Sequence, residues 1–310
     1  MPVDPQVQDL LREIAAMGTP PIHELSVEDA RAVAEGSTSL MAGETIEVGS
    51  VRDITIPVDG AEIGARVYSP SGEGPHPVVM FFHGGGWVIC SLDTHDNLAR
   101  AISRDADAVV VSVDYRMAPE HRYPTAAHDC FAATKWVAEN AASLNADASR
   151  LAVCGDSAGG NLSAVISQRA RDEGGPTISY AALIYPAVDM TRKGGSLDEN
   201  ASGYFLETDG MHWFMNHYIT EPERSETMAS PMLHADLSGL PDCFITTCEY
   251  DPLRDEGEAY GDALRANGVH AENKRYEGLI HGAATMTGVL DGGRRMVADV
   301  SAHLRKALHR

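Results

Sequence analysis

The chain has 310 residues, 44% of them hydrophobic and 22% charged, which is the composition of a packed globular protein rather than a disordered one. Its 24 basic and 45 acidic residues give a net charge of −21. Nucleic acids and anionic membrane surfaces are bound through clustered cations, so this charge argues against both as partners.

Two helices are expected at the start of the chain. Asp4 and Pro5 suit an N-cap and a first helical position, and apolar residues follow at helical spacing. A second helix is expected from Ser26, where Asp29 forms a loose capping box. Around residue 50 the apolar period changes to alternation. A turn at Asp59-Gly60 then predicts a hairpin.

The remainder of the chain alternates short β-branched segments with helical ones. This pattern predicts an α/β fold with a mainly parallel sheet, covered by helices on both faces and extended by the antiparallel hairpin at one edge. The expected strands are residues 77–82, 108–113, 151–154, 180–185, 243–248 and 271–276. The expected helices are residues 126–144, 161–172, 256–266 and 294–308.

Residues 190–230 interrupt this alternation and are interpreted as an insertion between two core strands. They contain an apolar stripe at helical spacing, formed by Met211, Phe214, Met215 and Tyr218. We interpret the stripe as a packed helix face, with direct contact to a substrate as the alternative.

The expected compartment follows from the cysteines and from the first residues. The five cysteines form no C-x-x-C pair, and their odd number favours reduced thiols. The first residues lack a basic segment followed by an apolar run, and the longest apolar runs are too short to cross a bilayer. We therefore expect a cytoplasmic protein.

The most informative motif is G-x-S-x-G at Gly155, Ser157 and Gly159, placed between an expected strand and an expected helix. A nucleophile elbow requires small neighbours around a serine that is held in a strained turn. The alternative is a glycine-rich turn without catalytic duty. The position between a strand and a helix favours the nucleophile.

A serine nucleophile requires a base and an acid that orients the base. Asp251 and His281 each follow a predicted strand, and the chain order Ser, Asp, His is typical of α/β-hydrolases. Three other carboxylates compete with Asp251 for the role of the acid, although their place at the start of a helix also suits the helix dipole. They are Asp255, Glu256 and Glu258.

The loop His83-Gly84-Gly85-Gly86 follows the strand at 77–82. Its glycines allow the backbone to approach a substrate and to direct N–H groups at an oxyanion. His83 is interpreted as structural. No H-E-x-x-H spacing occurs, so neither a metal nor another cofactor is expected.

Together these residues resemble the hormone-sensitive-lipase-like family of bacterial esterases within the α/β-hydrolases. The resemblance runs from about residue 50 to the C-terminus. Its motifs are His83-Gly-Gly-Gly-Trp87, Asp114-Tyr-Arg-Met-Ala-Pro-Glu120, Gly155-Asp-Ser-Ala-Gly-Gly-Asn161 and Asp251-Pro-Leu-Arg-Asp-Glu-Gly257.

The resemblance implies hydrolysis of short- to medium-chain carboxylic esters. In the implied mechanism Ser157 is the nucleophile, His281 the base and Asp251 the orienting acid. The backbone N–H groups of the oxyanion hole are then expected from Gly84, Gly85 and Ala158.

The resemblance also implies a helical cap over the catalytic core, and a homodimer formed through an edge strand is one expected assembly. The cap corresponds to residues 1–45 and 190–230, and the two parts of the α/β core to residues 46–189 and 231–310. The run Asp114–Glu120 is expected to brace the end of the sheet.

Two departures from the family pattern stand out. Ala283 replaces an aromatic residue two positions after the histidine, which predicts a roomier or differently shaped acyl pocket. Met117 replaces leucine, which is a conservative change. Two acidic neighbours of the triad, Asp156 and Glu249, either tune His281 electrostatically or bind backbone N–H groups.

Two rival functions are considered. The same triad could hydrolyse amides, carbamates or lactones, since a fold does not determine its substrate. The other rival is a non-catalytic receptor, because the plant gibberellin receptor resembles this family. That receptor departs from the family at the catalytic histidine, whereas His281 is present here, so the enzyme is favoured.

Overall fold

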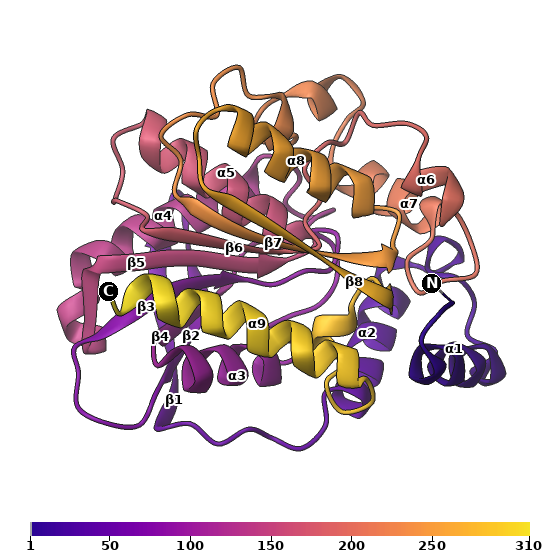
Figure 1. Ribbon diagram of the computed structural model, residues 1–310, viewed down its shortest axis with the longest axis horizontal. Coiled ribbons are helices and arrows are strands. Elements are labelled where there is room, and N and C mark those ends of the chain that lie inside the picture. The colour runs from indigo at the N-terminus through magenta and orange to yellow at the C-terminus, as the bar shows by residue number, and fades with distance from the viewer. Residues whose placement is uncertain (1) are drawn as a thin grey trace.

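The computed structural model describes residues 2–310, apart from the side chains of Thr38 and Ser39. Its described part contains an eight-stranded sheet in the order β1-β2-β4-β3-β5-β6-β7-β8 (Figure 1). The hairpin strands pair antiparallel, β2 pairs antiparallel with β4, and all other neighbours are parallel, which confirms the predicted α/β fold. The strands are β1 (Ser50–Val58), β2 (Ala61–Ser69), β3 (His76–Phe82), β4 (Val109–Asp114), β5 (Ala146–Asp156), β6 (Tyr180–Ile184), β7 (Asp242–Tyr250) and β8 (Ala271–Ile280).

Helices cover both faces of the sheet. On one face lie α4 (Thr125–Asn140), α5 (Ala158–Asp172) and α8 (Arg254–Ala266), and on the other lie α3 (Asp96–Ala106) and α9 (Asp291–Leu308) (Figure 1). Every residue of β3 is buried, with Met80 in one hydrophobic cluster and Phe81 in the other. A strand covered on both faces needs apolar residues at consecutive positions, as the sequence of β3 has.

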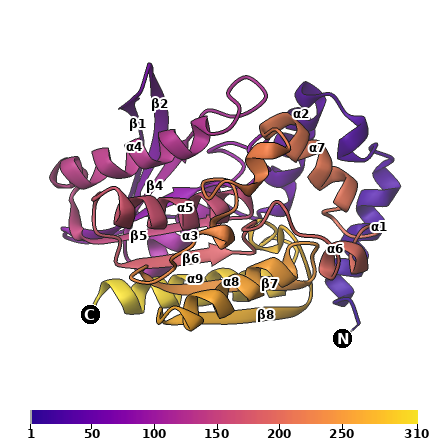
Figure 2. The ribbon, with the colours of Figure 1, turned by 90° about the horizontal axis from the view of Figure 1, so that it is seen from above.

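The remaining α-helices gather at the end of the molecule toward which the parallel strands point (Figure 2). They are α1 (Pro5–Met17), α2 (Val27–Met41), α6 (Ser196–Glu199) and α7 (Thr208–Tyr218). Asp4 Oδ1 accepts the N–H of Gln6 at 2.9 Å, and Ser26 Oγ accepts that of Asp29 at 3.1 Å. Both predicted helix starts are thereby confirmed. Short 3₁₀ turns span Ile22–Glu24, Ala141–Leu144, Pro222–Ser225, Pro231–Leu233 and Ala283–Thr285.

Several element boundaries differ from the prediction. The helix expected over 126–144 ends at Asn140 and continues only as a 3₁₀ turn. Helix α9 begins at Asp291, three residues earlier than expected. Glycine is a poor helix former, but Gly292 lies within this helix and packs against Leu279. Strand β8 extends beyond residue 276 to Ile280, with an irregular register opposite β7. Helix α3 was not among the expected elements.

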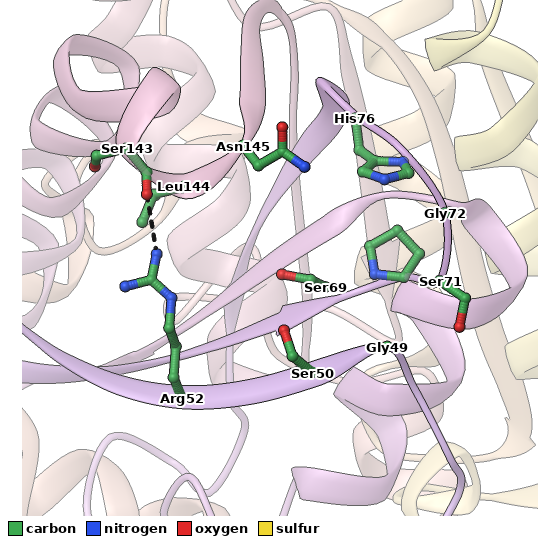
Figure 3. A pocket seen from close by; sticks show the side chains of 11 residues that line it. Gly49, Ser50, Arg52, Ser69, Ser71, Gly72, His76, Ser143, Leu144 and Asn145 are labelled. Atoms are coloured by element: carbon green, nitrogen blue, oxygen red, sulfur yellow. Dashed lines mark hydrogen bonds between the residues drawn. The ribbon is translucent and has the colours of Figure 1, made fainter.

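A cavity of about 640 Å³ is lined by residues that include Arg52, His76 and Asn145 (Figure 3). His76 begins β3 and Asn145 immediately precedes β5, so the cavity borders the amino ends of these parallel strands. In parallel α/β sheets, ligands bind outside the carboxyl ends of the strands. A functional site is therefore expected at the other end of the sheet, where the parallel strands have their carboxyl ends. Among the described residues, no helix combines the length and the apolar character needed to cross a membrane.

Candidate active site

The three residues expected to form a triad meet at the carboxyl ends of the strands. His281 Nδ1 donates a hydrogen bond to Asp251 Oδ2 at 2.7 Å, and His281 Nε2 accepts one from Ser157 Oγ at 2.9 Å. Ser157 lies 124 residues from His281 in the chain, so the fold and not local sequence joins them. The arrangement matches a nucleophile, a base and an acid that selects the tautomer of the base.

Ser157 occupies a sharp turn between β5 and α5. Its backbone angles are φ 55° and ψ −117°, a conformation that costs an L-residue roughly 1–3 kcal/mol. The turn requires glycine close by, because a β-carbon at Gly159 would collide with the carbonyl oxygen of Phe82. The N–H of Ser157 donates to Ile184 O at 2.8 Å and so ties the turn to β6. These features are those of the nucleophile elbow expected from the G-x-S-x-G motif.

Asp251 follows β7 directly and is completely buried. Its Oδ1 accepts the N–H of Leu253 at 2.8 Å, which leaves Oδ2 to His281. A buried carboxylate is stable only with such partners, and here both oxygens have one. Asp251 is thereby held in the orientation that its bond to the imidazole requires.

The three competing carboxylates are engaged elsewhere. Within residues 2–310 none of them bonds to His281. Each accepts hydrogen bonds that tie α8 to neighbouring segments. Burial raises the pKa of Glu256 to about 8, although its carboxylate accepts hydrogen bonds from two backbone N–H groups. Their partners are Ser196 for Asp255, Val188 and Asp189 for Glu256, and Thr247 and Arg275 for Glu258.

The glycine loop lies beside the serine, but one predicted donor is wrong. The N–H of Gly84 donates to Asp156 Oδ1 at 2.9 Å and so cannot face an oxyanion. Across the described part of the chain, the N–H groups of Gly85 and Gly86 make no hydrogen bond. Both glycines have positive φ, 107° and 58°. Ala158 is the first residue of α5, where backbone N–H groups have no partner within the helix.

Asp156 binds the loop and not the catalytic histidine. Besides the Gly84 N–H, it accepts a hydrogen bond from His95 Nε2 at 3.2 Å, and both side chains are buried. Burial by itself raises the pKa of Asp156, but the charge and hydrogen bond of His95, with smaller effects of His83 and Gly84, bring it below its ordinary value. Asp156 therefore binds a backbone N–H group, which is one of the two roles expected for it; the other was electrostatic tuning of His281.

Glu249 also binds a backbone N–H. Its Oε2 accepts the N–H of Gly278 at 2.7 Å, three residues before His281. Its contact therefore steadies β8 just ahead of the histidine.

His83 is fully buried and supports the glycine loop. Its Nδ1 donates to Gly84 O at 2.7 Å, and its ring stacks on Tyr115 with the centroids 4.4 Å apart. Tyr115 OH donates to His83 O at 2.8 Å, so the run Asp114–Glu120 contacts the loop at this point. These bonds agree with the structural interpretation of His83.

Two residues that sequence reasoning missed also contact this machinery. His95 holds Asp156, and Tyr185 packs its ring against that of His281 at 4.6 Å between centroids. Tyr185 is buried and directly follows β6, at the end of the strand expected over residues 180–185. No local motif marks either residue, because each acts through a partner distant in the chain.

Ala283 is fully buried in a hydrophobic cluster that also contains residues of α9. Phe205 and Met286 border the space beside Gly282, which follows His281. The roomier or differently shaped acyl pocket expected from Ala283 stays a prediction. No group of three or more His, Cys, Asp or Glu side chains suited to a metal occurs among the residues that the structure describes.

Comparison with known proteins agrees with this arrangement. A family model described as the α/β hydrolase fold matches residues 79–285. The carboxylic ester hydrolase LipN of Mycobacterium tuberculosis is 40% identical, over 98% of this chain and 84% of the relative. The carboxylesterase NlhH of the same species is 44% identical, over 84% of this chain and 83% of the relative.

Solved structures give the same result. A hyperthermophilic esterase from the archaeon Pyrobaculum calidifontis superimposes with a TM-score of 0.94 at 42% identity, and 99% of each chain is covered. The matches extend over nearly the whole chain and not over one motif alone. The chain therefore belongs to the α/β-hydrolases and, within them, to the hormone-sensitive-lipase-like family of carboxylesterases.

Proposed function

We propose that this carboxylesterase hydrolyses small esters of short to medium acyl chain length, with Ser157 as nucleophile, His281 as base and Asp251 as orienting acid. The observation that supports this most strongly is the unbroken hydrogen-bond chain from Ser157 Oγ through His281 to Asp251. These three residues are sufficient to activate the nucleophile.

In the first half of the reaction, Ser157 Oγ attacks the ester carbonyl carbon while His281 Nε2 takes the hydroxyl proton. The carbonyl oxygen becomes an oxyanion, for which we propose the N–H groups of Gly85, Gly86 and Ala158 as donors. Gly86 takes the place first expected for Gly84, because the Gly84 N–H is bound to Asp156.

Collapse of the tetrahedral intermediate breaks the bond to the alcohol oxygen, which receives the proton from His281 Nε2. The acyl group remains on Ser157 Oγ. A water molecule then gives a proton to His281 and attacks the acyl carbon, and the carboxylic acid leaves as Ser157 regains its proton. In both halves Asp251 stabilises the transient imidazolium.

Asp156 is proposed as a positioning residue that holds the glycine loop in register with the oxyanion. Replacing Asp156 with Asn gives the Gly84 N–H an uncharged and therefore weaker acceptor, and it also weakens the bond to His95. We expect kcat to fall about 10- to 100-fold with little change in KM, because the lost interaction acts on the transition state. Steady-state kinetics on a short-chain ester measure this. A rise in KM at unchanged kcat would contradict the assignment.

We propose residues 1–45 and 190–230 as the cap over this site. The stripe on α7 supports this, because a β-carbon on Gly86 would collide with the ring of Phe214, and Tyr218 stacks on Trp87 at 4.5 Å. The cap thus packs directly on the glycine loop. A covered site favours compact esters over esters with long acyl chains. The proposed reaction uses no cofactor.

We further propose a cytoplasmic location and a homodimer. All five cysteines are free thiols, which suits a reducing compartment. Strand β8 is at the end of the sheet and pairs on one side only, so it offers an edge for a second copy.

A panel of p-nitrophenyl esters of increasing acyl length tests the substrate class. We expect kcat/KM to be highest for short to medium chains and to fall for long ones, because the cap limits the room beside Ser157. Matched amides and lactones belong in the same panel. A maximum at long chains, or faster turnover of the amide than of the ester, would contradict the proposal.

A further inference from the structure

Phe205 is a large apolar side chain that remains 45% exposed beside the catalytic histidine. Its ring carbons Cε1 and Cδ1 lie 3.1 and 3.3 Å from where a β-carbon on Gly282 would be. Gly282 follows His281 directly. An exposed aromatic ring at this place costs solvation free energy and offers apolar area to a bound molecule.

The segment that carries Phe205 is tied to the acid loop of the triad. Asn200, which is buried, donates from Nδ2 to Asp251 O at 3.2 Å. The N–H of Thr208 donates to Ala201 O at 3.1 Å and closes the segment into a loop. Tyr204 packs on Tyr250, with the ring centroids 4.9 Å apart. The ring of Phe205 is therefore held at a defined place relative to His281.

The ring of Phe205 lies on the side of Ser157 where the alcohol half of the ester is expected. His281 Nε2 must come within hydrogen-bond distance of the alcohol oxygen to protonate it, so the alcohol group lies on the histidine side of Ser157. The oxyanion points instead toward the glycine loop. Phe205 borders the histidine side, at Gly282, together with Met286.

We infer that Phe205 determines specificity for the alcohol half of the substrate and favours esters whose alcohol carries an aromatic ring. This rests on the proposed esterase function. The ring of such an alcohol would cover the exposed face of Phe205, and aromatic pairs of this kind gain free energy beyond simple burial. A small alkyl alcohol offers little apolar area with which to cover this ring.

Two isomeric esters separate the alcohol half from the acyl half. Benzyl acetate places a benzyl group on the alcohol, and methyl phenylacetate places the same group on the acyl side. For Phe205→Ala we expect kcat/KM to fall roughly five- to tenfold on benzyl acetate, a size typical of losing one apolar contact. Activity on methyl phenylacetate and on methyl acetate should stay within about twofold of the wild type.

Phe205→Tyr keeps an aromatic ring and should retain the preference for benzyl acetate. Leu233→Ala removes another apolar side chain that is 41% exposed, and it should leave all three rates unchanged. A loss confined to methyl phenylacetate, or an equal loss on all three esters, would overturn the inference. If the wild type hydrolyses none of them, the proposed function fails instead, so the two failures are distinguishable.

Discussion

Replacing Ser157 with Ala is expected to lower kcat by roughly 10⁴- to 10⁶-fold. The variant lacks the oxygen that forms the acyl-enzyme, and the remaining donors can only assist direct attack by water. Because the side chain is small and partly exposed, the fold should survive. Steady-state hydrolysis of a short-chain p-nitrophenyl ester, with thermal unfolding as a check on folding, measures both.

A serine on the helix side of the elbow provides the matched control for this substitution. Ser163 lies on α5, where its hydroxyl donates to Gly159 O at 2.9 Å, and it does not contact His281. Ser163→Ala should therefore retain most of the activity. If Ser157→Ala hydrolysed the ester at a rate close to that of the wild type, another group would have to be the nucleophile.

Replacing Asp251 with Asn is expected to lower kcat by about 10³- to 10⁴-fold. The amide can still lie between Leu253 and His281, but its nitrogen would turn toward the imidazole and favour the wrong tautomer. The positive charge that develops on His281 would also lose its counter-charge. The effect should fall mainly on kcat, because Asp251 is buried and does not reach the substrate.

The competing carboxylate Asp255 is the control for this prediction. Asp255 binds Ser196 N and Arg254 and so helps to hold the segment that contains α6. Asp255→Asn should change stability modestly and leave most of kcat intact. If Asp255→Asn abolished catalysis while Asp251→Asn did not, the assignment of the acid would be wrong.

The catalytic residues could be predicted because their requirements are local. Gly155, Ser157 and Gly159 report a strained turn, and that turn needs those residue types whatever surrounds it. Asp251 and His281 could be placed because each follows a predicted strand, and the ends of parallel strands meet at one edge of the sheet. The same reasoning gave the sheet and its hairpin.

The supporting contacts could not be predicted because they depend on packing between distant segments. The partner of Gly84 is Asp156, 72 residues away, so the sequence offered no sign that this N–H is occupied. Phe205 belongs to an insertion without motif or period, and only the folded chain brings it beside Gly282. The start of α9 was also difficult to predict, because glycine disfavours a helix, yet Gly292 lies within α9 and fits against Leu279.

Covalent trapping shows directly whether Ser157 carries the acyl group. A phosphonate ester that mimics the tetrahedral intermediate would be added to the wild type and to Ser157→Ala, and the adduct located by peptide mass spectrometry. We expect one phosphonyl group per wild-type chain, on the peptide that contains Ser157, and the adduct should form in step with the loss of activity. The variant should form no adduct. Inactivation with the adduct on any other residue would contradict it.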